Sequence, residues 1–172
     1  MVVIIIAILA VVAIPQFEVF HDIKLRGAAK KLVSDIRLVQ RIALSRHADC
    51  KLEFNEVSNG YKACYCNEAD GTCAAGGCED ANWSSIKDPF TRGDLDVKYT
   101  SAAKSKYLGV DILNNFVDFR GTDTLRFDWQ GIPRDENGVV LVNVGSLIME
   151  YQDRRLIIRV TPQTGRVKVT LN

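Results

Sequence analysis

The sequence predicts an α+β protein in which one long N-terminal helix packs on antiparallel β-sheet. Apolar residues first follow helical spacing without a linker over residues 1–46, and after Asp49 they alternate with polar residues, as in strands. A chain of 172 residues, 47% hydrophobic and with a net charge of +1, can bury one core and has no overall charge that favours nucleic acid. We expect three parts: an apolar helix over 1–15, its amphipathic continuation over 16–48, and a β domain over 49–172.

The first part, Met1–Ile14, is apolar at every position and is followed by Pro15. A helix of this length spans roughly 21 Å, against about 30 Å for the hydrocarbon core of a bilayer. It is short for a membrane span, too uniformly apolar for one face of a soluble domain, and lacks the basic start of a signal peptide. We expect the downstream part of a longer apolar helix, in contact with an apolar environment. The residues assigned to this contact are Met1, Ile4, Ile5, Ile6, Leu9, Val12, Ile14 and Pro15.

The second part is predicted to be an amphipathic helix from Gln16 to about Arg46. Its apolar residues recur every three or four positions, so they share one stripe that should face the β domain. They are Leu25, Ala29, Leu32, Ile36, Val39 and Ala43. An ordinary surface helix would show the same pattern, and only direct fusion to the apolar segment favours one long stalk. A bend is expected near Pro15, which cannot donate a helical hydrogen bond, and Gly27 is a second weak point.

The third part is predicted to be a series of short antiparallel strands. The first hairpin pairs Leu52–Phe54 with Tyr61–Tyr65. With Asn59–Gly60 as a two-residue turn, Phe54 should lie opposite Tyr65. The outer face of this hairpin is predicted to carry Lys51, Glu53, Asn55, Cys64 and Cys66. Further strands are predicted at 95–100, 116–119, 124–130, 139–144, 156–161 and 166–171.

The apolar run and several later residues resemble a known family. The N-terminal helix of type IV pilins and type II secretion pseudopilins is similar to MVVIIIAILAVVAIPQF, with Pro15 at the position of the family's kink. The H-type minor pseudopilins and the FimT/FimU-type minor pilins share short similarities at Gln40–Ala43, at Phe127 with Gly131, and at Gly165–Val167. The family's cleavage glycine, methylated first residue and acidic assembly residue are not found in this sequence.

The resemblance implies a pilin-like fold and a structural, non-enzymatic subunit. Such subunits are held in the bacterial inner membrane by a single-pass helix, with the domain in the periplasm, and are then extracted into a pilus or pseudopilus. Their partners are other pilin or pseudopilin subunits and membrane lipid. Stacked helices bury in the filament the same surface that they buried in lipid, so the two are alternative environments for one segment.

Five cysteines occupy positions 50, 64, 66, 73 and 78. Zinc sites usually show C-x2-C pairs, which are missing here, and the compartment implied by the anchor favours disulfides. Cys64 and Cys66 point the same way two residues apart on a strand, which disfavours a bond between them. Each should therefore bond Cys73 or Cys78, and the sequence leaves the pairing open. Cys50 should be a buried free thiol on the core face of the first strand.

No constellation of residues predicts catalysis, a cofactor or a metal ion. His21 and His47 stand without a nucleophile and an orienting third group. The aspartates between residues 118 and 136 lack the spacing of a calcium-binding EF-hand and suit turns. We therefore expect a protein that is not an enzyme and binds no cofactor or metal.

Basic residues gather in the last strands, where no acidic residue occurs after Arg154. They are Arg154, Arg155, Arg159, Arg166 and Lys168. Val167, Val169 and Leu171 should face one way, and Lys168 the other. A basic strand face could hold DNA phosphates, and some FimT-like relatives are associated with DNA uptake, so a DNA-binding minor pilin is the alternative function. A solvated sheet face or a contact with a neighbouring subunit would give the same pattern.

Overall fold

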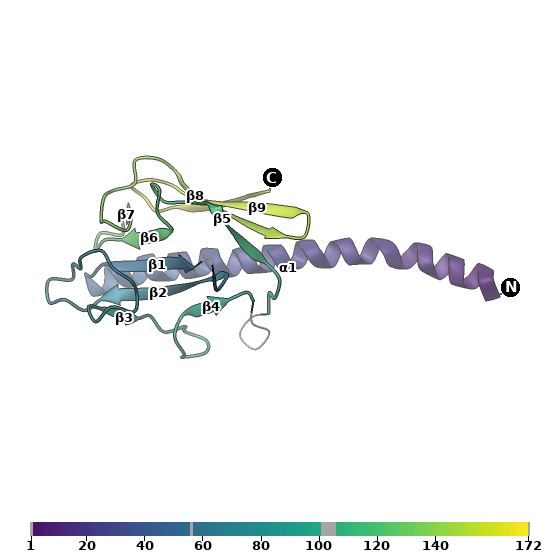
Figure 1. Cartoon of the computed structure of the whole chain (residues 1–172), viewed down its shortest axis with the longest axis horizontal. Coiled ribbons are helices and arrows are strands. Elements are labelled where there is room, and N and C mark those ends of the chain that lie inside the picture. Colours follow the sequence, from purple (N-terminus) through teal and green to yellow (C-terminus); the bar gives the residue numbers. More distant parts are fainter. Residues whose placement is uncertain (1, 56, 101–105, 172) are drawn as a thin grey trace.

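The computed structural model of the chain describes residues 2–55, 57–100 and 106–171, with the backbone alone described for 2–20 and 114–116. Figure 1 shows one long helix, two groups of strands beside it, and a helical N-terminal end that projects beyond both groups. The elements are α1 (Val2–Arg46), β1 (Cys50–Asn55), β2 (Gly60–Cys66), β3 (Trp83–Ser85), β4 (Asp96–Lys98), β5 (Asp111–Asp118), β6 (Thr124–Phe127), β7 (Pro133–Arg134), β8 (Gly145–Tyr151), β9 (Arg154–Val160) and β10 (Val167–Leu171).

The strands form two antiparallel sheets. Within the described residues the larger sheet has six strands, in the order β3-β2-β1-β6-β7 with β4 also paired to β2, and the smaller has four in the order β10-β9-β8-β5. The helix α1 packs against strands of both sheets, namely β1, β6, β8, β9 and β10. A long helix on antiparallel sheets is the α+β architecture that the sequence predicts, so the predicted fold class is confirmed.

The predicted apolar stripe of α1 faces the sheets. All six of its residues, from Leu25 to Ala43, are at most 1% exposed and join the main core, which confirms the stripe. The helix runs through Pro15 without interruption, and its ribbon curves only gently in Figure 1. Gly27 lies where the ring of Tyr107 closes on the helix: a β-carbon at this position would come within 2.8 Å of that ring.

The register of the first hairpin differs from the prediction by four residues. Phe54 lies opposite Tyr61 rather than Tyr65, and Gly60 is the first residue of β2 rather than part of the turn. The side chain of Asn55 accepts a hydrogen bond from the backbone of Ser58 at 2.8 Å, which favours a longer turn. Because the shift is even, every side chain keeps the face that was predicted for it.

One strand assignment from the sequence is wrong. Residues 139–144 form a loop in which Val140 makes one isolated bridge, to Arg134, and strand β8 follows directly after this loop. The apolar run at 139–144 has strand propensity but no continuous neighbouring strand to pair with. The remaining predicted segments overlap β4, β5, β6, β9 and β10. Strands β3, β7 and β8 were not predicted.

Candidate functional site

The residues predicted to lie in lipid or in a filament core belong to the projecting end of α1. Met1 lies outside the described residues, and the backbone of Ile4, Ile5, Ile6, Leu9, Val12, Ile14 and Pro15 is helical. Within the described part of the chain, no helix is both long enough and apolar enough to span a membrane. The contact assigned to these residues stays a prediction.

The four loop cysteines form two disulfides. Cys64 bonds Cys78, and Cys66 bonds Cys73, so each strand cysteine reaches forward to one loop cysteine. The four cysteines and Trp83 form a second buried cluster, separate from the main core. The loop after β2 therefore covers the face of the larger sheet that α1 leaves uncovered.

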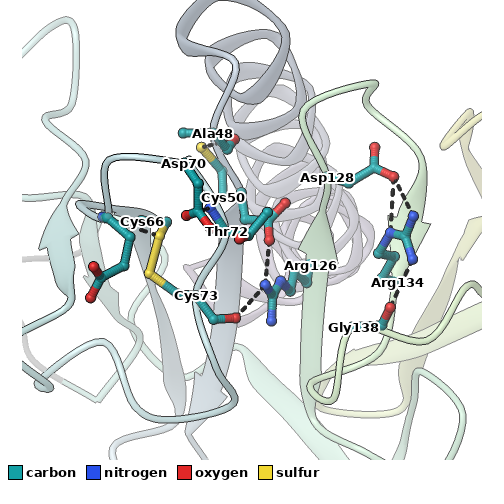
Figure 2. Close-up of polar contacts among 12 residues, drawn as sticks. Ala48, Cys50, Cys66, Asp70, Thr72, Cys73, Arg126, Asp128, Arg134 and Gly138 are labelled. Carbon is teal, nitrogen blue, oxygen red and sulfur yellow. Dashed lines mark hydrogen bonds and ion pairs between the residues drawn. A yellow bond between two sulfur atoms is a disulfide. The ribbon is translucent and has the colours of Figure 1, made fainter.

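The covered face holds a buried ion pair that the sequence gave no reason to expect. Arg126 on β6 pairs with Asp49, and both residues are at most 5% exposed. Figure 2 shows the Arg126 guanidinium also reaching the backbone carbonyl of Cys73, at 2.6 Å. The backbone of Asp49 bonds Gly71 and Cys66, so this aspartate links the end of α1 to the disulfide loop. A buried charge of this kind is tolerated only while its partners remain in place.

Lys51 is the second cation on this face; it lies on the outer side of the hairpin as predicted, but it is buried. Its side chain is 2% exposed, donates a hydrogen bond to the carbonyl of Gly76 and lies 4.2 Å from the centre of the Trp83 ring. Burial lowers the pKa of Lys51. The alternation of β1 gave the correct face, but nothing in it indicated that a loop would cover that face.

A polar cluster connects α1 to β2 through Tyr61 and to the segment after β3 through Asp88. The hydroxyl of Tyr61 donates to Asp35 at 2.6 Å, while Lys31 donates to Asp35 at 2.7 Å and to Asp88 at 3.0 Å. Burial raises the pKa of the Asp35 carboxyl. The four-residue spacing of Lys31 and Asp35 was a readable signal of a helical ion pair, but Tyr61 and Asp88 meet it only through the fold.

The free thiol of Cys50 lies in the main core and is 0% exposed, with its sulfur 3.6 Å from the carbonyl oxygen of Ala48. Burial, reinforced by the charge of Asp49, raises the pKa of the thiol from 9.0 to about 12. The folded chain therefore holds this proton in a range where the unfolded chain releases it, so stability should fall as pH rises from about 9 to about 12.

We expect iodoacetamide at pH 8 to leave the native, unreduced chain unlabelled and to add one label, on Cys50, once the chain unfolds. A Cys50→Ala variant should lose stability less steeply above pH 9, because the titrating thiol is gone. Mass spectrometry locates the label, and urea unfolding at several pH values measures the slope. Rapid labelling of the native chain, or an unchanged slope, would contradict this assignment.

The five basic residues near the C-terminus do not form one site. Lys168 lies directly opposite Arg159 across β10 and β9, and both are exposed on the outer face of the smaller sheet. Arg166 is exposed just before β10. Arg155 forms an ion pair with Glu150, and Arg154 lies opposite Tyr151 at the turn between β8 and β9. Only Arg159, Arg166 and Lys168 are therefore brought together.

The two histidines lie apart, each beside an aromatic ring. The ring of His21 meets Tyr151 edge-on at 5.4 Å, and that of His47 lies 6.3 Å from Trp129. Among the residues that the structure describes, no group of three or more His, Cys, Asp or Glu side chains is placed to hold a metal ion.

No family model matches the sequence, and no curated protein matches it. Among solved structures, the chain is similar to the minor pseudopilin EpsH from the type 2 secretion system of Vibrio cholerae, with a TM-score of 0.56 and 9% identity over 86% of this chain and 97% of that one. It is also similar to the type IV minor pilin FimU of Pseudomonas aeruginosa PAO1 in two crystal forms, with a TM-score of 0.48, identities of 12% and 15%, and coverage of 85% of this chain and 87% and 92% of the FimU chains. At these identities the likeness to EpsH establishes the fold, and the chain has the pilin-like fold of a minor pseudopilin, as its sequence predicts.

Proposed function

We propose that this protein is a structural, non-enzymatic subunit of a type IV pilus or type II secretion filament. One observation carries the proposal: a 45-residue helix whose apolar end projects from a domain with the fold of a minor pseudopilin. A helix that is apolar on every side has no preferred face for its own domain and needs an apolar environment from elsewhere. Other pilin-like subunits supply that environment in an assembled filament.

The apolar segment, residues 1–15, serves two environments in turn. Before assembly it anchors the subunit in the inner membrane, with the β domain on the periplasmic side, where disulfides persist. During assembly it leaves lipid and packs against the same segment of neighbouring subunits. The transfer costs little hydrophobic free energy, because the buried apolar surface stays buried.

A charge in the apolar segment provides the test. Leu9→Lys should move the full chain from the membrane fraction to the soluble fraction and remove it from filaments sheared off the cells, because a lysine at the centre of an apolar helix costs about 2.5–3.5 kcal/mol in a bilayer. Cell fractionation and immunoblotting of sheared filaments measure both effects. Thermal unfolding should not change, since the packed stripe begins at Leu25.

Two variants control for substitution as such. Leu9→Ile keeps the segment apolar, and Ser34→Lys adds a lysine at an exposed position of α1, so both should fractionate like the unchanged chain. Filaments that incorporate Leu9→Lys as well as the unchanged chain would contradict the proposed role of this segment.

A DNA-binding minor pilin is the alternative. Its support is the exposed set of Arg159, Arg166 and Lys168 on one side of the smaller sheet. Three cations supply few phosphate contacts, and phosphate contacts dominate the affinity of proteins for DNA. The filament role is therefore the better supported of the two.

A further inference from the structure

The smaller sheet ends in an open edge at β10. This strand pairs with β9 on one side and stands last in the strand order. The backbone of Thr161 bonds Arg166 at 2.9 Å, and bonded pairs alternate along an antiparallel ladder. Val167, Val169 and Leu171 therefore direct their N–H and C=O groups away from β9. These three residues present a row of donors and acceptors at two-residue spacing.

The other sheet edges are less suited to pairing. The opposite edge of the same sheet, β5, breaks its register between Leu113 and Asp118. In the larger sheet, β3 and β4 have three residues each and β7 has two. Proteins commonly protect sheet edges with short or irregular strands of this kind. By contrast, β10 pairs with β9 in an unbroken register over all five of its residues.

A groove runs beside this open edge. It has a volume of about 630 Å³ and lies between α1 and β10. Val33 and Val169 contribute its apolar lining, and Val169 is 42% exposed. Side chains of a strand added to β10 would point alternately into this groove and onto the outer face of the sheet.

Cations border the edge on both sides. Lys30, Arg37 and Arg41 line the groove, and Arg159 and Lys168 lie on the outer face. Among the described residues, no carboxylate lines the groove or forms an ion pair with these five side chains. An extended chain whose acidic side chains all point to one face can place them in the groove beside Lys30, Arg37 and Arg41, and so fits this arrangement.

We propose that the β10 edge binds an extended segment of a partner protein in which acidic and apolar side chains alternate, and that this segment adds to the smaller sheet as a fifth strand. Backbone hydrogen bonds to Val167, Val169 and Leu171 supply affinity, and the cations supply selectivity. The proposal goes beyond the filament role and does not depend on it.

The chemistry of the edge favours a peptide over nucleic acid. The outward groups of β10 include carbonyls, which accept hydrogen bonds and repel phosphate oxygens, whereas a peptide backbone offers N–H groups to them. The edge also disfavours a second copy of this chain. Joining two β10 edges would place two Lys168 and two Arg159 side chains on one face, and like charges on neighbouring strands are destabilising.

The test measures binding of a short fluorescent peptide of alternating glutamate and valine to the full chain in nonionic detergent, by anisotropy. A peptide of alternating lysine and valine is the matched probe and should not bind. Val169→Pro removes an outward N–H and adds a ring at the edge, without removing a bond to β9, so it should weaken binding at least about tenfold. Val169→Thr keeps the backbone and should bind like the unchanged chain.

A charge variant tests the groove independently of the strand. Arg37→Glu with Arg41→Glu should also weaken binding about tenfold or more, while Lys87→Glu, at an exposed site paired with Asp94, should have little effect. Failure of the glutamate–valine peptide to bind would overturn the proposal. So would binding that survives both Val169→Pro and the charge reversal, displacement of the peptide by short duplex DNA, or self-association of the chain that Val169→Pro abolishes.

Discussion

Replacing Asp49 with alanine is expected to lower the free energy of unfolding by about 3–5 kcal/mol. The substitution leaves the Arg126 guanidinium buried, with the carbonyl of Cys73 as its remaining hydrogen-bond acceptor. Lys51, also buried on this face, keeps its charge nearby and adds to the uncompensated positive potential. Urea unfolding of the full chain in nonionic detergent, followed by tryptophan fluorescence, measures the change.

The control for Asp49→Ala is an exposed ion pair. Glu150→Ala removes the partner of Arg155, whose side chain is 49% exposed, and should cost less than about 1 kcal/mol. Arg126→Met combined with Asp49→Ala should recover part of the loss, because no unpaired guanidinium remains in the double variant. If Asp49→Ala and Glu150→Ala lowered the free energy of unfolding equally, burial of the Asp49–Arg126 pair would not add to the cost of breaking it.

The second large effect is expected at the disulfides. Replacing Cys64 and Cys78 by serine, or Cys66 and Cys73 by serine, should each lower the free energy of unfolding by about 2–3 kcal/mol. The bonds close loops with sequence separations of 14 and 7, so the first pair should cost slightly more in the chain-entropy model. Urea unfolding under oxidising conditions measures both variants.

The same measurement in reductant supplies the internal control. Dithiothreitol should lower the free energy of unfolding of the unchanged chain by more than it lowers that of either double-serine variant. Each variant has already lost one disulfide bond. Cys50→Ala should respond to reductant like the unchanged chain, since Cys50 takes part in neither disulfide. A reductant response that disappears in Cys50→Ala would point to a different pairing.

Local sequence patterns predicted the helix and its packed face. Strand boundaries and strand pairing depend on contacts between residues distant in sequence, so local patterns did not predict them. The stripe from Leu25 to Ala43 follows from 3.6-residue periodicity alone. Strand β8 has the expected alternation, with Leu147 and Met149 buried, but it joins β9 through a turn in which Gln152 takes a positive φ of 54°. Glutamine gives no turn signal at such a position, so the boundary between the two strands was not visible.

In the candidate site, too, local patterns predicted some features and the folded structure determined the others. Compartment and strand geometry predicted that the loop cysteines would pair forward, but the choice between Cys73 and Cys78 depends on how the loop folds over β2. The open edge at β10 could not be predicted, because strand order is a property of the whole sheet. The cations at Arg37 and Arg41 were visible as the outer face of a helix, and only the fold places them beside that edge.

Strand β1 is enclosed on both edges and both faces, so solvent reaches its backbone only when the domain opens. This strand lies between β2 and β6, with α1 on one face and the disulfide loop on the other. Its amide hydrogens can exchange with solvent only when those neighbours separate, so their exchange rates report the free energy of global unfolding. The outward amides of β10 need no such opening and exchange early. The chain thus combines its most protected segment and an exchange-accessible edge within one small domain.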